Sequence, residues 1–488
     1  MKGISFDRLM IGLLFTAVGL TACLMPAQSD TYWHLRAGQD LWLTHHVPLV
    51  EHYSLTAAGR FWPNHEWLWQ ALSYAVYRVG GMPLLTGLAA LIVVAAFALV
   101  YRLMVGAATT RFALLVLGVP IGACVWALRP QIVSLALLAL LVTLLARERY
   151  RWLPLLFIVW ANVHGAVALG GAVLAAAAAL AALRARSGDP EDRRRAWTLA
   201  ALTPICAVAT AATPLGPRLW PFILESMRHS HASMIAEWLP VYAMAGPVEI
   251  AFWVLAPAFV FLLWRRWRAL HAWSDVVIVA AAVVVLPLAV RAVRNVPPFL
   301  LLAMPAASRL LGPGFRLGRI SNGADVEHPR LNAALLASLA LAGVGVVGFA
   351  WATRLPILGW RPFAPEVVAA LRACPGPLYN RYNEGGFLIW FVPERPVFID
   401  SRQDPYPHDF IMEAGQASLE ARPEPLIARW GLRCALLPKA STTIAALHAD
   451  GWRTTFADDH WTVLAASDSR LTSGGAPARD PAPSPAPR

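Results

Sequence analysis

Apolar runs long enough to form helices recur through the first 352 residues and are separated by short polar or arginine-rich segments. A helix of about 20 apolar residues crosses the hydrocarbon core of a bilayer. We therefore predict an all-α, polytopic helical bundle over residues 1–352, with about 11 spans plus interfacial helices. The runs lie at residues 9–25, 83–101, 112–127, 131–146, 152–163, 166–183, 196–212, 249–264, 273–290, 296–311 and 333–351.

Parts of this threading have an alternative. The runs at 152–163 and 166–183 are short or interrupted by glycine. Residues 65–79 form either a further span or a helix that lies along the interface. The alternative is therefore a number of membrane spans that differs from 11 by two.

The pattern changes after residue 352. Apolar segments shrink to strand length, as in GPLYN, PVFID, CALLP and WTVLAA, and helical stretches lie between them. This alternation predicts a small α/β domain at residues 353–467. Residues 468–488 are rich in Pro, Ala, Ser and Gly, which predicts a disordered tail.

The composition excludes a single water-soluble domain. Of the 488 residues, 58% are hydrophobic and 14% are charged, against about 25% charged in an average soluble protein. The net charge of +12 is carried almost wholly by arginine. Arginine suits both cytoplasmic anchoring of spans and bidentate binding of phosphate. For a chain embedded in a membrane we expect no nucleic-acid partner.

The arginine clusters orient the predicted spans. If every run crosses once, they all fall on one side, which the positive-inside rule identifies as the cytoplasm. The N-terminus is then cytoplasmic. The first run is either a signal peptide or a first span, and an uncleaved anchor is preferred because the run continues past Cys23. The outer loops 27–82 and 213–248 and the α/β domain are extracytoplasmic.

Cys374 and Cys434 are the two cysteines of the predicted C-terminal domain. They could pair if this domain faces an oxidising compartment. Five cysteines in the chain are too few for a disulfide scaffold, and the sequence favours free thiols over the pairing.

Polar side chains at the outer ends of spans are the first candidates for function, because polar groups are costly at membrane depth. Asp30 directly follows the first span, and His34 lies four residues later on the same face of a helix. Asp30 is a candidate functional residue, and capping of a helix N-terminus is its alternative role. The histidines of this loop lack the spacing of a zinc enzyme, so interfacial contacts are favoured over a metal.

A second group lies beside helix-breaking residues. Arg129 precedes Pro130, and Asn162 and His164 precede Gly165. The alternatives to substrate binding are snorkelling of Arg129 to the interface and an interhelical hydrogen bond by Asn162, which is favoured for that residue.

A third group is RAVRNVPPF. Arg291 and Arg294 are three residues apart, which predicts one helical face, and Asn295 precedes the two prolines that start the next span. Arginines on the outer side run against the inward bias of positive charge, which favours a functional role. Converging with Arg129, they would form a phosphate-binding mouth. The loop 213–248 is predicted to carry an interfacial helix.

The C-terminal domain contains the polar motif YNEGGFLIWFVPERPVFIDSRQDPY. Its two glycines indicate a turn or a tight helix start. The motif covers the membrane site, binds an acceptor, or makes structural hydrogen bonds at a domain interface. Its polar residues are Asn383, Glu384, Asp400, Arg402 and Asp404.

Short motifs along almost the whole chain resemble a known superfamily. DTYWHLRAGQDLW, HEWLWQAL, LRPQ, NVHG, EW, RNVPPF, NEGGFLIW and FIDSRQDPY are similar to those of a mostly uncharacterised bacterial family. That family is one of GT-C membrane glycosyltransferases, related to protein mannosyltransferases and the lipid A aminoarabinose transferase. The resemblance implies inverting transfer of a sugar from a polyprenyl-phosphate carrier at the outer face of the bacterial inner membrane. It also implies a first-loop acid as base. Only Asp30 matches that acid, and Thr31 stands where the well-studied transferases often have a second one.

The residues suggest how such a reaction would run. Asp30 would take the acceptor proton, while Arg129, Arg291 and Arg294 would stabilise the departing phosphate. His34 and His164 would orient Asp30 or contact the donor. Because arginines neutralise a single phosphate, we expect no obligatory metal or other cofactor. The remaining candidates for substrate binding are Asn162, Asn295, Glu66 and Glu237, the two glutamates being reserve candidates for the base.

The expected partners are a polyprenyl-phosphate-linked sugar, membrane lipid, and a glycan, lipid or protein acceptor. A rival function is a non-catalytic transporter, flippase or assembly factor for lipid-linked glycans. A transporter needs polar groups reached in turn from both sides near the midplane. Here they gather at one mouth, which favours an enzyme, and the resemblance implies that it transfers a hexosyl or pentosyl group. The loose histidine spacing disfavours a metal-dependent membrane hydrolase.

Overall fold

The computed structural model describes residues 4–124, 126–229, 236–315 and 328–467. The main chain divides into two compact units. The helical unit comprises Met1–Gln28, Ala37–Val47 and Pro63–Trp360, and the C-terminal unit comprises Ser29–Arg36, Pro48–Trp62 and Arg361–Arg488. Two pieces of the predicted first outer loop therefore belong to the C-terminal unit. The predicted disordered tail, 468–488, lies outside the described residues.

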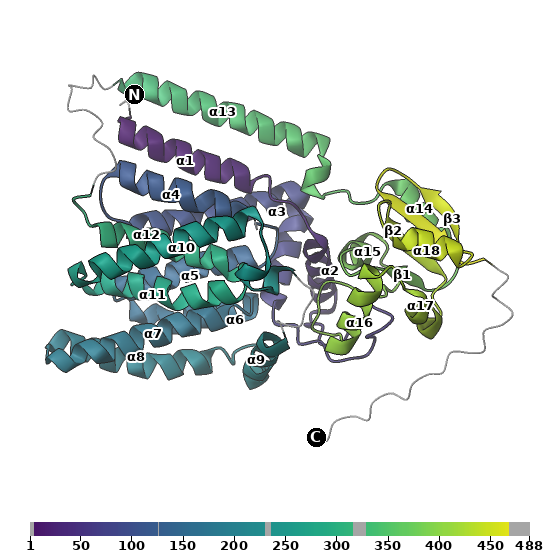
Figure 1. Cartoon of the computed structure of the whole chain (residues 1–488), viewed down its shortest axis with the longest axis horizontal. Helices are drawn as coiled ribbons and strands as arrows, with labels where there is room; N and C mark the ends of the chain where they lie inside the picture. Colours follow the sequence, from purple (N-terminus) through teal and green to yellow (C-terminus); the bar gives the residue numbers. More distant parts are fainter. Residues whose placement is uncertain (1–3, 125, 230–235, 316–327, 468–488) are drawn as a thin grey trace. The chain divides into compact units, whose positions relative to one another are not determined.

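Each of the eleven apolar runs coincides with a helix (Figure 1). These helices are α1(Phe6–Ala22), α3(Trp67–Leu103), α4(Ala108–Ala123), α5(Gln131–Ala146), α6(Leu153–Val163), α7(Val167–Arg184), α8(Pro190–Ala209), α10(Pro247–Arg266), α11(Trp273–Arg291), α12(Val296–Leu311) and α13(Pro329–Thr353). The outer loops contain α2(Ser29–Thr44), which both units share, and α9(Leu219–His229). Two short 3-10 helices, η5(Ala236–Trp238) and η8(Val293–Asn295), also matter for the site.

Proline sets the start of several of these helices. α8 begins at Pro190, α10 at Pro247 and α13 at Pro329, where the missing N–H is not needed and the fixed φ suits a helix. The side chain of Asp189 accepts a hydrogen bond from the backbone N–H of Glu191, which caps α8.

Helix α3 is two helices joined at a break. Gly80 and Gly81 have non-helical backbone angles, and Gly81 has φ 62° and ψ −156°, a conformation that a residue with a Cβ avoids. Residues 67–79 thus form a separate helical piece before the longer apolar segment. Whether that piece crosses the membrane stays a prediction.

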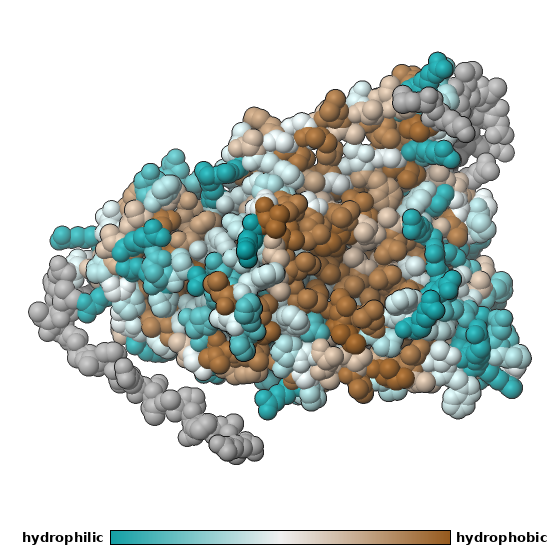
Figure 2. Space-filling model, turned by 180° about the vertical axis from the view of Figure 1, so that it is seen from behind, coloured by the Kyte–Doolittle hydropathy of each residue, from teal (hydrophilic) through white to brown (hydrophobic). Residues whose placement is uncertain are grey.

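The apolar surface identifies a multi-pass membrane protein. Among the described residues, five helices combine the length and hydropathy of a span: Trp67–Leu103, Val167–Ser187, Pro247–Ala269, Trp273–Arg291 and Pro329–Thr353. Figure 2 shows a broad hydrophobic area on the surface of the helical unit. The exposed side chains include Trp253, Phe261, Leu341 and Phe349. The predicted number of 11 crossings is not confirmed, because α4, α5 and the other short helices do not meet both criteria.

The C-terminal unit has the predicted alternation of helices and strands. Its four strands lie in the order β1-β2-β4-β3, with β1 parallel to β2 and the other pairs antiparallel. The strands are β1(Leu378–Asn380), β2(Cys434–Pro438), β3(Arg453–Ala457) and β4(Trp461–Ala465). The helices are α14(Pro365–Ala373), α15(Gly385–Phe391), α16(His408–Leu419), α17(Glu424–Trp430) and α18(Thr443–Ala449). Tyr379, Phe398, Leu426 and Leu437 are buried in its core.

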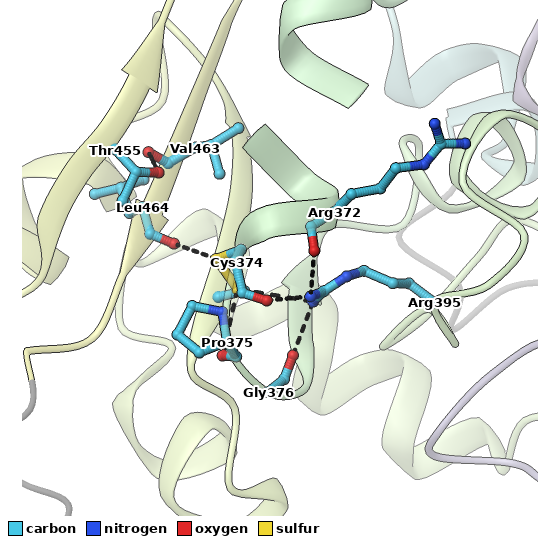
Figure 3. The surroundings of a disulfide bond; sticks show 9 residues. Arg372, Cys374, Pro375, Gly376, Arg395, Thr455, Val463 and Leu464 are labelled. Atoms are coloured by element: carbon cyan, nitrogen blue, oxygen red, sulfur yellow. Dashed lines mark hydrogen bonds between the residues drawn. A yellow bond between two sulfur atoms is a disulfide. The ribbon is translucent and has the colours of Figure 1, made fainter. Parts of the chain in front are cut away.

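A disulfide joins Cys374 and Cys434, which corrects the expectation of free thiols (Figure 3). The bond connects the end of α14 to the start of β2. Arg395 donates hydrogen bonds to the carbonyl oxygens of Gly376 and Cys374. The pairing depends on β1 lying beside β2, which the spacing of the cysteines along the chain does not reveal.

Replacing Cys374 and Cys434 by serine is expected to lower the unfolding free energy of the C-terminal unit by about 2–4 kcal/mol. The two cysteines are 60 residues apart, and their bond restricts the unfolded chain. Limited proteolysis across a denaturant series measures the loss. Cys124→Ser, at an exposed free cysteine, is the control, and equal midpoints for all three proteins would contradict the prediction.

Candidate functional site

Asp30 lies in the first turn of α2 and belongs to the C-terminal unit. Its half-buried carboxylate accepts two hydrogen bonds at Oδ1. Trp33 Nε1 donates one over 3.2 Å, and Ser401 Oγ donates the other. A carboxylate is favourable at a helix N-terminus, but the two side-chain donors also orient this one.

His34 is buried beside Trp33, with their ring centroids 3.6 Å apart. Trp33 thus packs against the His34 ring and also donates a hydrogen bond to the Asp30 carboxylate. That His34 itself orients Asp30 or contacts the donor stays a prediction.

The two glycines of the NEGG motif start α15 and allow a close approach of main chains. The Gly386 N–H donates to Ser29 Oγ over 2.9 Å. A Cβ on Gly386 would collide with the Ser29 carbonyl oxygen, and a Cβ on Gly385 would collide with the Ile399 carbonyl oxygen. The motif therefore needs both glycines for packing beside Ser29 and Ile399.

The charged residues of the C-terminal motif form a buried cluster with the first outer loop. Arg402 forms ion pairs with Asp400 and Glu51, and all three side chains are fully buried. The guanidinium carbon lies 4.9 Å from the ring centroid of Tyr53 and 4.8 Å from that of Trp62. We call Glu51, Asp400 and Arg402, with the two rings, the Arg402 cluster. Of the roles that the sequence left open, structural bonding is the one seen for Asp400 and Arg402.

Two further residues of this motif lie next to the cluster. Tyr406 donates a hydrogen bond from its hydroxyl to Asp400 Oδ2 over 2.6 Å. Burial raises the pKa of Asp404 to about 7, although nearby Arg402 acts in the opposite direction. Asp404 therefore carries less than a full negative charge at neutral pH.

In the helical unit, two arginines meet at one carboxylate. Arg129 Nη2 lies 3.3 Å from Glu237 Oε1, and Arg294 Nη1 lies 3.8 Å from the same oxygen. We call these three residues the Glu237 cluster. Burial raises the pKa of Glu237, but the positive charges of Arg294 and Arg129 outweigh it, so the pKa lies below its ordinary value. Glu237 therefore stays ionised. Because its pKa is low, it accepts a proton less readily than an ordinary carboxylate, which makes it a weak candidate for the base.

Short 3-10 helices position the Glu237 cluster. The Val293 N–H donates to the Leu239 carbonyl over 3.0 Å, which ties the segment of η8 to that of η5. The Arg294 guanidinium carbon lies 4.0 Å from the ring centroid of Trp238. Arg129 also donates to Gln28 Oε1 over 3.2 Å. Its guanidinium is therefore held by protein side chains and does more than snorkel to the interface.

Arg291 and Arg294 do not share a helical face, and that prediction is wrong. Helix α11 ends at Arg291, and Ala292 is extended with φ −151° and ψ 128°. Arg291 is exposed, whereas Arg294 is half-buried in η8. Asn295 donates to the carbonyl oxygen of Leu288 over 3.0 Å, which already accepts from the Ala292 N–H over 3.1 Å, so its side chain is held against the end of α11.

A second polar group in the helical unit consists of His65, Glu66 and His164, which we call the Glu66 cluster. Glu66 Oε1 lies 3.7 Å from Nε2 of each histidine. Burial, aided by the charge of Arg294, lowers the pKa of His65 to about 4. His65 is therefore neutral at pH 7. Its Nδ1 donates to the Pro63 carbonyl oxygen over 3.1 Å, so its Nε2 is an acceptor.

The orientation of His164 is set from the opposite side of its ring. Trp160 Nε1 donates to Ser134 Oγ over 2.9 Å, and the same hydroxyl lies within hydrogen-bond distance of His164 Nδ1, 2.9 Å away. This contact fixes the ring so that Nε2 faces Glu66.

Asn162 makes the interhelical hydrogen bonds that the sequence favoured for it. Its Oδ1 accepts from Trp67 Nε1 over 2.6 Å, and its Nδ2 donates to the carbonyl oxygens of Ile158 and Ala212, each over 2.8 Å. These bonds join α3 and α6 to the end of α8. Its predicted role in substrate binding stays a prediction.

The helical unit thus brings Arg129, Arg294 and Glu237 together, and Glu66 with His164. Sequence reasoning did not identify Trp33, Ser401, Trp238 or Ser134 as partners of candidate residues. No local signal marks Ser401 as a partner of Asp30, because the two lie 371 positions apart. Within the described ranges, no group of three His, Cys, Asp or Glu side chains is arranged to hold a metal ion.

Comparisons with known proteins show the fold. No protein-family model matches the chain, and no curated protein matches it by sequence. Solved structures do match. ArnT from Cupriavidus metallidurans bound to undecaprenyl phosphate has a TM-score of 0.55 at 13% identity, covering 95% of this chain and 98% of that one. Its apo state has a TM-score of 0.53 at 14% identity, covering 94% and 98%.

A second protein agrees. The archaeal oligosaccharyltransferase AglB from Archaeoglobus fulgidus, in complex with an inhibitory peptide and a dolichol-phosphate, has a TM-score of 0.52 at 9% identity. This match covers 89% of the present chain and 70% of AglB. At these identities the likeness concerns the fold alone, and it confirms the fold implied by the sequence motifs.

Proposed function

We propose that this chain is an integral-membrane glycosyltransferase that moves a sugar from a polyprenyl-phosphate donor to a cell-envelope acceptor with inversion. The GT-C fold over nearly the whole chain supports a membrane transferase. The single observation that carries the donor class is the meeting of Arg129 and Arg294 at Glu237. A pair of guanidinium groups suits the phosphate of a lipid carrier.

The arginines would act on the leaving group. When the bond between C1 of the sugar and the phosphate oxygen breaks, negative charge grows on the polyprenyl phosphate. The Arg129 guanidinium, already held by Glu237 and Gln28, and that of Arg294, paired with Glu237, can stabilise that charge without reorganising. Because the charge grows in the transition state, this contact lowers the barrier as well as strengthening donor binding.

Asp30 would act on the acceptor. An acceptor hydroxyl gives its proton to the Asp30 carboxylate as its oxygen bonds to C1 on the face opposite the phosphate. The sugar is thereby transferred with inversion, and the lipid phosphate leaves. The position of Asp30 in the first turn of α2, held at Oδ1 by two donors, supports this role.

The Glu66 cluster suits a sugar ring. His65 Nε2 and Glu66 Oε1 are both acceptors and lie 3.7 Å apart. A sugar hydroxyl donates hydrogen bonds to such acceptors, and His164 Nε2 lies 3.7 Å from the same Glu66 oxygen. We therefore assign His65, Glu66 and His164 to hydroxyl groups of the transferred sugar, and retain Asn162, Asn295 and Arg291 only as secondary candidates.

The proposed location is the bacterial inner membrane, with the N-terminus cytoplasmic and the C-terminal unit extracytoplasmic. The Cys374–Cys434 disulfide supports this orientation, because disulfides persist in oxidising compartments and are rare in the cytosol. The arginine clusters between the apolar runs support it independently.

Replacing Arg129 or Arg294 by glutamine is expected to lower kcat/KM for donor by about 10- to 100-fold, the size of a lost charge-assisted hydrogen bond. The assay follows label from purified undecaprenyl-phosphate hexoses and pentoses into envelope extract, using the full chain in proteoliposomes. Arg294→Lys should recover only part of the rate, because an ammonium group lacks the planar fork.

Arg228→Gln, at an exposed residue of α9, is the matched control and should leave the rate unchanged. Equal rates for all four variants and the native chain would contradict the proposal that Arg129 and Arg294 bind the donor phosphate. Donor binding by the native chain without transfer to any acceptor would refute a transferase and favour a transporter or assembly factor.

A further inference from the structure

In the chain of the C-terminal unit, Ser401 lies between two fully buried residues of opposite charge. Asp400 and Arg402 flank it, and its own side chain is half-buried. The Ser401 hydroxyl donates a hydrogen bond to Asp30 Oδ1 and lies 3.4 Å from Ser29 Oγ. A residue distant in the chain thus contacts the carboxylate proposed as the base.

The main chain around Ser401 is held on both sides by the Arg402 cluster. Arg402 Nε donates to Asp400 Oδ1 over 2.8 Å, and its Nη1 pairs with Glu51. The backbone N–H of Arg402 also donates to Asp400 Oδ1, over 2.9 Å. These bonds close a tight turn over Asp400–Arg402, with Ser401 at its tip.

Further hydrogen bonds position Ser401 itself. The Tyr382 hydroxyl donates to the Ser401 carbonyl oxygen over 2.9 Å. Ser29, the neighbour of Asp30, accepts from the Gly386 N–H over 2.9 Å, so the start of α2 is fixed against α15. The turn and the helix start are therefore each held independently of the contact between Ser401 and Asp30.

Two donors on one carboxylate oxygen restrain its orientation. Trp33 comes from the same helix as Asp30, three residues later, and restrains the carboxylate from within α2. Ser401 comes from the turn of the Arg402 cluster and restrains it from a second direction. A base has to be held within about 0.5 Å of its productive geometry, and rotation about the side-chain bonds of an aspartate would exceed this.

We propose that Ser401 is a positioning residue for the general base, orienting Asp30 through the hydrogen bond to Oδ1. This inference rests on the proposed function, because it assigns to Ser401 an effect on the rate of transfer. It gives the Arg402 cluster a role in catalysis that is exerted through Ser401. The motif FIDSRQDPY is then a support for the base and not an acceptor site.

The test compares hydroxyl-bearing and hydroxyl-free residues at position 401 in the full chain. Ser401→Ala is expected to lower kcat about 10- to 100-fold, the effect of losing a hydrogen bond to a charged group, with KM for the undecaprenyl-phosphate sugar unchanged. Ser401→Thr keeps the hydroxyl and should restore most of kcat. In an Asp30→Asn background, Ser401→Ala should cause no further loss, because its effect passes through Asp30.

Thr56→Val is the matched control. Thr56 also belongs to the C-terminal unit, and its hydroxyl donates to the Phe398 carbonyl oxygen over 2.6 Å. This variant removes a hydroxyl that has no part in holding Asp30, so kcat should not change. Thermal unfolding of each detergent-solubilised variant identifies any that fails to fold. If Ser401→Ala does not fold, the kcat of Ser401→Thr, compared with that of the native chain, tests whether the hydroxyl is what position 401 supplies.

The outcomes separate the two proposals. Native chain that transfers no sugar refutes the proposed function. Native chain that is active, with Ser401→Ala equally active, overturns the positioning role alone. A loss in Ser401→Ala that is fully additive with Asp30→Asn also overturns it, because the serine would then act elsewhere. Infrared difference spectra, with Asp30→Asn as the reference, need no turnover. They should show the carboxylate band shifted in Ser401→Ala and restored in Ser401→Thr.

Discussion

Asp30→Asn is expected to lower the rate of sugar transfer by about 100- to 10,000-fold, the usual contribution of a general base. Asparagine has the same shape, and its Oδ1 can still accept hydrogen bonds from Trp33 and Ser401. It cannot take a proton from an acceptor hydroxyl. The loss should therefore fall on kcat, measured as the initial rate of label transfer at saturating undecaprenyl-phosphate sugar.

Asp40→Asn supplies the matched control for this variant. Asp40 lies on the same helix, α2, and is also half-buried, so a general effect of removing a carboxylate would show there. We expect its transfer rate to equal that of the native chain. An Asp30→Asn protein that folds and transfers sugar at the native rate would remove Asp30 as the base.

Arg402→Met is expected to lower the unfolding free energy of the C-terminal unit by about 3–5 kcal/mol, as when one partner of a buried ion pair is removed. Methionine fills much of the space between Tyr53 and Trp62 but leaves Glu51 and Asp400 buried without their cation. Limited proteolysis of the C-terminal unit across a denaturant series measures the change.

Two comparison proteins make this prediction specific. Arg372→Met breaks the ion pair of Arg372 with Glu394, whose side chains are 57% and 46% exposed, and should cost no more than about 1 kcal/mol. Adding Glu51→Gln to Arg402→Met removes one uncompensated charge and should recover part of the stability. If Arg402→Met proves no more destabilising than Arg372→Met, the cluster does not hold the unit together.

Much of the fold could be predicted because it depends on local patterns. Apolar runs produce helices wherever they occur, and each of the eleven coincides with one. Proline at the start of α8, α10 and α13 marks boundaries that need no tertiary partner. The α/β alternation of the C-terminal unit could be predicted in the same way, because its apolar segments have the length of strands and are shorter than membrane spans.

The candidate site was harder to predict, because its contacts depend on tertiary structure. Periodicity placed Arg291 and Arg294 on one face, whereas the helix ends at Arg291 and the extended Ala292 turns the chain. The convergence of Arg294 with Arg129 requires η8 to lie beside η5. Spacing along the chain contains no information about such a juxtaposition.

The sequence by itself determined the class of the protein, its helices, and the interhelical hydrogen bonding of Asn162. Each follows from the polarity of neighbouring residues, which acts over a few positions. Only the tertiary structure decided that Ser401 contacts Asp30, that Arg402 is buried with Glu51 and that Cys374 pairs with Cys434. These contacts join residues 371, 351 and 60 positions apart, because packing of the whole C-terminal unit supplies the free energy that brings them together.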